Sequence, residues 1–503
     1  MARSYLEAIL EARVYDVAVE TRLHEAALLS ERLGKRILLK REDSQQIFSF
    51  KLRGAYNMMS RLSPGALRRG VVAASAGNHA QGVALAAHRL STEATIVMPV
   101  TTPQIKVDAV CALGATVVIE GASYDDAEMK ARHIARTRKL SFVHAYDDPD
   151  VIAGQGTIGM EILRQCQHPI GAVFVPVGGG GLIAGIAAYV KALRPETLIV
   201  GVEPTDANAM QRSLHAGRRI RLAQVGQFAD GVAVGQVGVE PFRLARRFVD
   251  EMMLVSTDEI CAAMKDVFED TRAIVEPSGA LAVAALKRYA EHRQGVSETL
   301  VAVISGANIN FDRLRFVAER AELGDQREAV FAATIPERPG SFKAFCRLIG
   351  RRNITEFNYR VDDPAEAHVF VGVEVHDRLE TERLLASLDR AGLPTLDLSD
   401  NEMAKLHGRH LVGGRARVKD EVLYRFEFPE RPGALMDFLD SLAETWNISL
   451  FHYRNHGADY GRVLVGIQVP STERRAFRSS LARIGYANWD ESRNPAYRLF
   501  LGG

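Results

Sequence analysis

Cysteine is scarce in this chain, and the few cysteines that are present lie far apart. Cys111, Cys166, Cys261 and Cys346 form no Cys-x-x-Cys pair among the 503 residues. This distribution excludes a zinc knuckle and a disulfide framework. Separated free thiols are typical of a reducing compartment, so a cytoplasmic location is expected.

An excess of charge of either sign is also missing. Lysine and arginine number 63 and aspartate and glutamate 62, which leaves a formal net charge of +1. This balance predicts no general affinity for nucleic acid or for an anionic membrane surface. With 47% apolar and 25% charged residues, the composition is that of an ordinary folded soluble protein.

The sequence has no long uninterrupted hydrophobic run. Residues 171–190 include no charged residue, but Pro176 and the four glycines Gly178 to Gly181 interrupt them. A membrane-spanning helix tolerates such breaks only with help from neighbouring helices, so a buried strand, a turn and a buried helix are predicted. Glu7 and Glu11 among the first apolar residues argue against a signal or transit peptide.

What the chain does contain, over residues 1–320, is a regular alternation of strand and helix patterns. The length predicts several domains, and this alternation predicts an α/β domain of two similar lobes. Predicted strands cover 36–40, 70–74, 94–98, 116–119, 172–177, 198–202 and 299–304. Predicted helices include 4–12, 24–33, 51–62 and 103–113.

The C-terminal part contains an internal repeat. Residues 336–340 (Pro-Glu-Arg-Pro-Gly) return at 429–433, and the segment 353–360 returns at 447–454. Each copy has the order strand, helix, strand, strand, helix, strand, which predicts a ferredoxin-like fold. The period is too long for a solenoid. Two small domains are therefore predicted, with a Gly- and Arg-rich linker between them; the boundaries are 328–400, 401–420 for the linker, and 421–503.

Four consecutive glycines separate a predicted strand from a predicted helix. The backbone N–H groups of Gly178 to Gly181 can converge on an anion at the helix N-terminus, which favours a phosphate site. A tight turn alone would need only one or two glycines. The same letters fit a dinucleotide fingerprint with Glu203 as the ribose-binding acid. A nucleotide-dependent oxidoreductase is therefore an alternative.

Three other segments carry candidate site residues. A poorly solvated lysine such as Lys51, beside Phe50, can form a Schiff base, although most lysines at helix starts are surface charges. Ser75 and Asn78 follow a buried strand and together suit a carboxylate, whereas a helix cap needs only one of them. Ser305 also follows a strand and could bind a ring nitrogen, but this motif alone favours an ordinary turn.

Taken together, these segments resemble a known family. Ser49–Gly54, Ser75–His79, Gly178–Gly181 and Ser305–Asn308 occur in the order of the serine/threonine dehydratases. These are pyridoxal-phosphate enzymes of fold type II, with a two-lobed catalytic domain like the tryptophan synthase β subunit. The duplicated tail resembles the paired ACT-like regulatory domains of biosynthetic threonine deaminases. The resemblance covers essentially the whole chain.

The resemblance implies pyridoxal 5'-phosphate as the cofactor and gives roles to the candidate residues. Lys51 would carry the cofactor and then remove the substrate's α-proton, and Ser75 would receive the substrate carboxylate. The other residues would bind the cofactor: its phosphate at Gly178, Gly179, Gly180, Gly181 and Leu182, its ring at Phe50, its phenolic oxygen at Asn78, and its pyridine nitrogen at Ser305.

The resemblance further implies β-elimination of L-threonine to 2-oxobutanoate and ammonia, the first step of isoleucine biosynthesis. L-Serine is expected as a second substrate, isoleucine as an inhibitor, valine as a candidate activator and a homotetramer as the assembly. The tyrosines among the effector-site candidates could equally be core residues. The candidates are Arg338, Gly340, Tyr359, Arg431, Gly433 and Tyr453.

Some positions depart from the family pattern. Arg22, Ile47 and Ala307 replace the usual residues without removing a chemical group. The stretch 203–209 lacks the final carboxylate that eukaryotic serine racemases use for a divalent metal, so no metal site is expected. A serine dehydratase, threonine synthase or racemase of the same fold remains an alternative, as does a catalytically silent amino-acid sensor.

Overall fold

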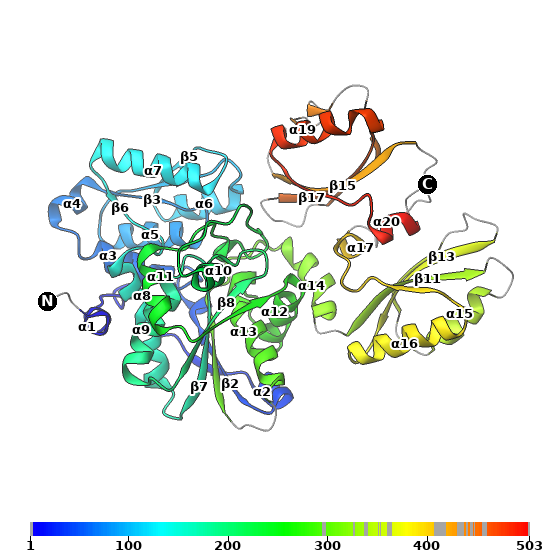
Figure 1. Ribbon diagram of the computed structural model, residues 1–503. Helices are drawn as coiled ribbons and strands as arrows, with labels where there is room; N and C mark the ends of the chain where they lie inside the picture. The colour runs from blue at the N-terminus through cyan, green and yellow to red at the C-terminus, as the bar shows by residue number, and fades with distance from the viewer. Residues whose placement is uncertain are drawn as a thin grey trace. The chain divides into compact units, whose positions relative to one another are not determined.

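The computed structural model divides the chain into two compact units, Met1–Asn310 and Phe311–Gly503. Each is described by itself (Figure 1). The described residues are 4–293, 298–324, 327–336, 341–350, 352, 354–359, 365–406, 419–429, 437–438, 441–442, 446, 448–454 and 460–500.

The first unit contains two sheets. The larger has the strand order β1-β2-β10-β7-β8-β9, and the smaller has the order β5-β4-β3-β6. All neighbouring strands are parallel except β1 and β2. The strands are β1 (Leu23–Glu25), β2 (Arg36–Arg41), β3 (Val71–Ala74), β4 (Ala94–Met98), β5 (Thr116–Ile119), β6 (Ser141–Phe142), β7 (Ile170–Pro176), β8 (Leu198–Pro204), β9 (Glu251–Val255) and β10 (Thr299–Ile304).

Helices cover both faces of each sheet in this unit, as parallel sheets require. In the smaller sheet, the side chains of β3 alternate: Val71 and Ala73 pack against α3 and α5, while Val72 and Ala74 pack against α7. The helices are α1 (Tyr5–Leu10), α2 (Ala27–Leu33), α3 (Lys51–Met59), α4 (Pro64–Arg69), α5 (Asn78–Arg89), α6 (Gln104–Ala112), α7 (Tyr124–Arg138), α8 (Pro149–Gln165), α9 (Gly181–Leu193), α10 (Ala209–Ala216), α11 (Val239–Phe248), α12 (Thr257–Thr271) and α13 (Pro277–Glu291). The predicted α/β fold of two lobes is confirmed.

Two sequence predictions in this unit have different outcomes. The uncharged segment 171–190 forms β7, a glycine turn and α9, as predicted. The helix predicted at 24–33 is wrong at its start, because residues Leu23–Glu25 pair with β2 as the edge strand β1. The helix α2 begins only at Ala27, where the carboxylate of Asp270 accepts hydrogen bonds from the N–H groups of Leu28 and Leu29 at 2.8 and 3.1 Å.

The second unit contains two antiparallel four-stranded sheets with the orders β12-β13-β11-β14 and β16-β17-β15-β18. In each, the first strand lies between the third and the fourth, which confirms the ferredoxin-like prediction. The elements are α14 (Arg313–Gly324), β11 (Glu328–Pro336), α15 (Ser341–Ile349), β12 (Ile354–Tyr359), β13 (Glu366–Glu374), α16 (Arg378–Arg390), β14 (Thr395–Asp397), α17 (Glu402–Leu406), β15 (Glu421–Pro429), β16 (Ile448–Arg454), β17 (Tyr460–Gln468), α19 (Arg474–Ile484), β18 (Ala487–Asp490) and α20 (Pro495–Phe500).

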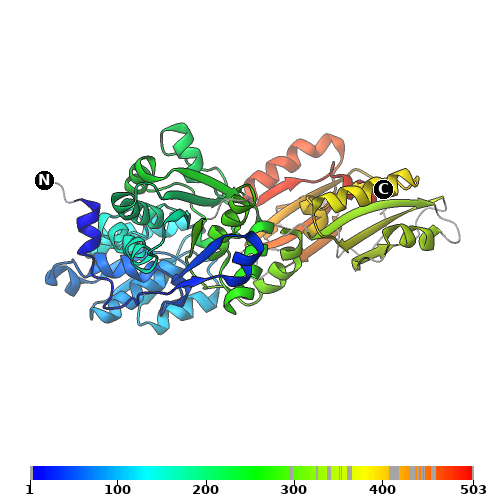
Figure 2. The same ribbon diagram turned by 90° about the horizontal axis from the view of Figure 1, so that it is seen from below.

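Both faces of these sheets are apolar, and they have different partners. In β11, Ala329 and Phe331 pack under the helices of their own repeat, while Val330 and Ala332 join a cluster with Leu423 and other residues of the second repeat. This alternation follows from the two-residue period of a strand. In Figure 2 the long yellow-green strands of the first repeat run side by side. Because the cluster with Leu423 contains residues of both repeats, the two repeats pack together through the sheet faces that their helices leave uncovered.

The segment 401–420, predicted as a linker, is helical at its start. Helix α17 begins after Asn401, whose side chain exchanges two amide hydrogen bonds of 3.1 and 3.4 Å with Asn494, 93 residues further on. Asn494 precedes α20 in the same way. Both short helices contribute to the apolar cluster between the repeats. The prediction missed α17 because a five-residue helix has little periodicity.

Candidate active site

The predicted site segments meet in one pocket of the first unit, with about 480 Å³ of space not filled by atoms, including open solvent at its mouth. These segments lie at the carboxyl ends of strands and at the starts of helices, where open α/β sheets commonly bind ligands. Ser75 is not among the lining residues. The lining residues are Phe50, Lys51, Asn78, Ala145, Tyr146, Gln155, Pro176, Gly178, Gly179, Gly180, Gly181, Leu182, Gly231, Val232, Glu276, Ser278 and Ser305.

Lys51 is the first residue of α3 and points its amine into this pocket. Its Nζ donates a hydrogen bond of 3.3 Å to the carbonyl of Ala145 and lies 5.2 Å from the ring centre of Phe50. Burial lowers the pKa of Lys51 to about 8, although the nearby Glu276 carboxylate acts in the opposite direction. A lysine with this pKa supplies far more neutral amine near pH 7 than an exposed one, which suits a nucleophile or a base.

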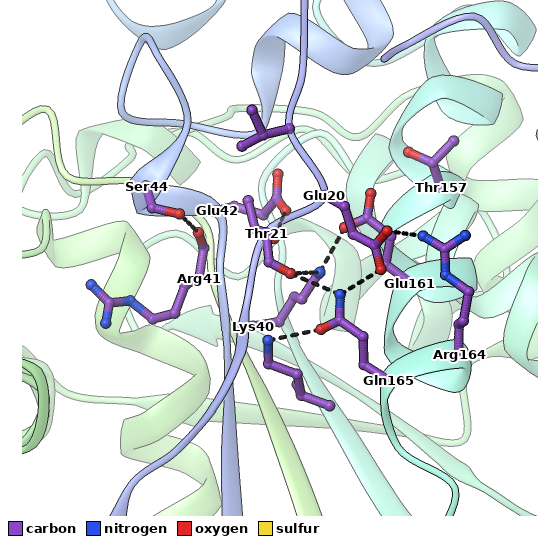
Figure 3. A network of polar contacts seen from close by, with 12 residues as sticks. Glu20, Thr21, Lys40, Arg41, Glu42, Ser44, Thr157, Glu161, Arg164 and Gln165 are labelled. Atoms are coloured by element: carbon purple, nitrogen blue, oxygen red, sulfur yellow. Dashed lines mark hydrogen bonds and ion pairs between the residues drawn. The ribbon is translucent and has the colours of Figure 1, made fainter.

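Helix α3 is held in place by a buried ionic network behind Lys51, part of which is shown in Figure 3. Arg53 donates hydrogen bonds of 2.7 and 2.8 Å to Glu42 and of 2.6 and 3.0 Å to Glu161. Lys40 donates 2.6 Å bonds to Glu161 and to the carbonyl of Thr21. All four charged side chains of this network are fully buried. Two cations facing two carboxylates leave this network with no net charge.

Removing one carboxylate charge from this network is expected to destabilise the fold. Glu161→Gln leaves Arg53 and Lys40 without a shared counter-charge, and breaking a buried pair costs about 3–5 kcal/mol. Urea denaturation followed by circular dichroism should show an earlier transition. Glu120→Gln, in the partly exposed pair with Lys130, is the matched control and should cost less than about 1 kcal/mol. Equal midpoints for the two variants would contradict this account.

The glycine turn between β7 and α9 can hold an anion. Among the described residues, the N–H groups of Gly178, Gly179 and Gly180 have no hydrogen-bond acceptor, and they precede the N-terminus of α9. Side chains are excluded here: a Cβ on Gly178 would lie 2.9 Å from the Cα of Val232, and one on Gly179 would overlap the ring of Tyr146. Free N–H groups at a helix N-terminus suit a phosphate.

Asn78 and Ser305 lie in this pocket with defined partners. Asn78 begins α5, donates from Nδ2 to Glu276 at 2.8 Å and accepts from Nδ2 of Asn308 at 2.6 Å. Ser305 follows β10, is buried, and donates from Oγ to the carbonyl of Ser278 at 3.3 Å. Both side chains can hydrogen-bond a polar aromatic ring in the pocket, so the expectations about them stay open.

Ser75 is placed differently from the other predicted site residues. It follows β3, is half-buried, and its Oγ accepts a 3.2 Å hydrogen bond from the N–H of Gly77. The hydroxyl thus stabilises the turn that leads to Asn78. Its expected role in binding a substrate carboxylate stays a prediction.

Sequence reasoning missed several pocket residues, above all Glu276 and Ser278. They stand in the run Glu276-Pro277-Ser278-Gly279 at the start of α13, where an acid, a proline and a serine are common helix-start residues. Only the fold shows that the carboxylate faces Lys51. Tyr146 lies in the connection between β6 and α8, and Gln155 lies within α8. Neither segment carries a recognisable motif, so nothing in the sequence distinguished these two residues.

The structure argues against the dinucleotide interpretation, because the predicted ribose-binding acid, Glu203, caps a helix. The carboxylate of Glu203 accepts hydrogen bonds of 2.7 and 2.8 Å from the N–H groups of Met210 and Gln211 in the first turn of α10. Burial raises the pKa of Glu203 to about 8. Glu203 is therefore occupied as a helix cap and does not face a ribose site.

The effector-site candidates can be placed only in part. Arg338, Gly340, Arg431 and Gly433 lie outside the described residues. Tyr359 ends β12, and Tyr453 lies in β16; only their backbone is described. These two tyrosines thus occupy corresponding strands of the two repeats, and the proposed effector role is untested.

Two features are absent from the described residues, a membrane-spanning helix and a metal-binding cluster. None of their helices is long and apolar enough to cross a membrane. No group of three or more histidine, cysteine, aspartate or glutamate side chains in the described ranges could hold a metal ion.

The residues of the pocket fit pyridoxal phosphate. Lys51 would supply a reactive amine, the glycine turn would supply anion-binding N–H groups, and Phe50, Asn78 and Ser305 would supply ring and polar contacts. When bound, such a cofactor accepts the electrons released at a substrate's α-carbon.

Comparison with known proteins identifies the family. Residues 14–306 match the family described as pyridoxal-phosphate dependent enzyme, and residues 319–407 and 412–501 match the C-terminal regulatory domain of threonine dehydratase. The biosynthetic L-threonine dehydratase of Burkholderia multivorans is 60% identical over 99% of both chains. The chloroplastic biosynthetic threonine dehydratase of Arabidopsis thaliana is 54% identical over 99% of this chain and 84% of its own.

Solved structures agree with this result. The processed form of threonine deaminase isoform 2 from Solanum lycopersicum is 53% identical, with a TM-score of 0.62 over 63% of this chain and 92% of its own. The maize serine racemase structure is 31% identical, with a TM-score of 0.59 over 63% of this chain and 97% of its own. The comparisons give no support to the alternative functions. The chain belongs to the family of pyridoxal-phosphate-dependent threonine dehydratases that carry a C-terminal regulatory domain.

Proposed function

We propose that this protein converts L-threonine to 2-oxobutanoate and ammonia by β-elimination, as the first step of isoleucine biosynthesis. The observation that carries the proposal is the meeting of Lys51, with its lowered pKa, and the glycine turn in one pocket. An amine that is partly neutral near pH 7 and a phosphate site are the two requirements that a pyridoxal-phosphate lyase places on its protein.

We assign the following roles in the reaction to residues of this chain. Pyridoxal phosphate, when bound, would supply the electron sink for the α-carbon of the substrate. Lys51 Nζ, as the neutral amine, would take the α-proton, and the cofactor phosphate would supply the proton with which the β-hydroxyl leaves as water. The turn that contains Ser75 and Asn78 binds the substrate carboxylate through its hydroxyl and N–H groups. Ser305, unlike an aspartate, leaves a ring nitrogen unprotonated, which favours prompt elimination over transamination.

The duplicated tail is proposed to regulate this activity. Isoleucine would bind near Arg338, Gly340, Tyr359 or their counterparts in the second repeat and inhibit the enzyme, and valine would oppose it. A homotetramer and a cytoplasmic location belong to the same proposal. Support comes from the two ferredoxin-like repeats that pack through an apolar cluster, because such an interface can shift between two arrangements.

The proposal is tested by initial rates with purified protein. Formation of 2-oxobutanoate from threonine, faster than formation of pyruvate from serine, is the expected result, and added isoleucine should lower the rate. Absence of threonine turnover in protein that holds pyridoxal phosphate would refute the catalytic proposal. A rate that isoleucine leaves unchanged would refute the regulatory part alone.

The lowered pKa of Lys51 predicts a pH dependence for loading the cofactor-free enzyme. Only the neutral amine attacks an aldehyde, so attachment of pyridoxal phosphate should accelerate as pH rises and level off above a midpoint of about 8. At pH 7 about a tenth of the amine is neutral, against less than about a thousandth for an ordinary lysine. Stopped-flow absorbance measures the rate, and a midpoint near that of an exposed lysine would contradict the prediction.

A further inference from the structure

Glu276 is the acidic residue among the side chains that line the pocket. It is 3% exposed and stands at the start of α13, and nothing in the proposed chemistry uses it. An unused buried carboxylate beside a reactive lysine needs a physical reason, because burying a charge is costly unless partners compensate for it.

The partners of Glu276 all donate hydrogen bonds to it. Asn78 donates from Nδ2 at 2.8 Å to one oxygen and 3.1 Å to the other, and the N–H of Asn308 donates at 3.1 Å. Ser278 donates from Oγ at 2.5 Å. Amide nitrogens cannot accept a hydrogen bond, so the ionised carboxylate fits this set better than a protonated one.

These contacts determine which way Asn78 faces. Its Oδ1 already accepts from the Nδ2 of Asn308 at 2.6 Å, and that same nitrogen donates to the carbonyl of Ile47 at 2.8 Å. An amide has two N–H groups that diverge widely, whereas the two oxygens of one carboxylate lie close together, so the contacts at 2.8 and 3.1 Å can share a single N–H of Asn78. The second N–H of Asn78 is then available in the pocket, as a donor to an oxygen of the cofactor ring.

Charged and titratable groups around Glu276 are contributed by several elements. Lys51 lies on α3, Asp230 begins the 3-10 turn at residues 230–232, and Lys106 on α6 forms a 2.8 Å ion pair with Asp230. Burial and Asp230 raise the pKa of Glu276, whereas Ser278, Asn78 and Lys106 oppose the rise. His79 and His144 interact electrostatically with Lys51, and burial lowers the pKa of each.

We propose that Glu276 is a positioning residue that orients Asn78 toward the cofactor and supplies the negative charge that Lys51 faces. It acts through Asn78 and Lys51 and need not touch the substrate. The inference rests on the proposed function only in that the pocket takes up pyridoxal phosphate. Its test uses cofactor-free protein, so a failure here and a failure of threonine turnover are separate results.

The first experiment titrates Lys51 in the full-length, cofactor-free protein. Brief labelling with acetic anhydride across a pH series, with the Lys51 peptide quantified by mass spectrometry, gives the midpoint of amine deprotonation. In Glu276→Gln the midpoint should fall below about 8, because the opposing charge is gone. Glu276→Asp is the matched control: it keeps the charge, so its midpoint should stay at about 8. An unchanged midpoint in Glu276→Gln, or an equal fall in both variants, would overturn the proposal.

The second experiment measures orientation through affinity for pyridoxal phosphate. Glu276→Gln should weaken binding to the cofactor-free protein by about 10–100-fold, the range for a lost charge-assisted hydrogen bond. If this variant does not fold, Glu276→Asp carries the test. Aspartate keeps the charge but withdraws it from Asn78, so we expect weaker binding with an unchanged Lys51 midpoint. Wild-type affinity in Glu276→Asp would then overturn the proposal.

Discussion

Lys51→Ala protein should form no measurable 2-oxobutanoate from threonine and should lack the yellow absorbance of bound pyridoxal phosphate. The substitution removes the amine that attaches the cofactor and the base that takes the α-proton. Loss of a general base alone costs about 10²–10⁴-fold in rate, and loss of the covalent attachment adds to it. Absorbance spectra and the threonine assay measure the two effects on the same sample.

The control for this experiment is Lys130→Ala, which removes a lysine from a partly exposed ion pair on α7. It should retain wild-type colour and rate. Adding methylamine to Lys51→Ala tests whether an external amine restores part of the proton transfer. A Lys51→Ala protein that still turns over threonine at a rate near wild type would remove Lys51 from the mechanism.

Gly179→Ala should be the second most damaging change, through loss of cofactor binding. The added Cβ would overlap the Tyr146 ring, which also lines the pocket, so the ring or the glycine turn must move. Either movement disturbs N–H groups that would bind a phosphate, and each lost hydrogen bond to a charged group costs about 1.5–3 kcal/mol. We therefore expect pyridoxal phosphate to bind at least about 10-fold more weakly.

Gly65→Ala is the matched control, because Gly65 is only half-buried in α4 and a Cβ there would lie 3.8 Å from its nearest neighbour, the flexible side chain of Arg69. It should bind the cofactor normally. Circular dichroism of both variants separates a local effect from a folding defect. Normal cofactor affinity in folded Gly179→Ala would show that the glycine turn is not the phosphate site.

The fold could be predicted where buried strands form continuous apolar runs. β3 and β10 are buried along their whole length and β7 at every residue except Gly171, and all three stand close to their predicted positions. Short elements were missed: β1 has three residues and α17 five, and both are held mainly by tertiary contacts. Asp270 at the start of α2 and Asn494 opposite Asn401 lie too far along the chain for a local pattern to reveal them.

The pocket could be predicted where a residue's chemistry is visible in its own segment. Four consecutive glycines after a strand point to an anion, and Lys51, Asn78 and Ser305 gained meaning from their order along the chain. The roles of Glu276 and the buried network around Arg53 could not be derived in this way. Their partners come from distant segments, and an isolated glutamate or arginine in sequence is usually a surface charge.

The central claim is that Lys51, and no other lysine, holds pyridoxal phosphate in this protein. Borohydride reduction of the loaded enzyme makes the linkage permanent, and peptide mapping by mass spectrometry then locates it. The account predicts the pyridoxyl group on the peptide that contains Lys51, with none on Lys40 or Lys106. A label on a different lysine, or no label in protein that turns over threonine, would contradict it.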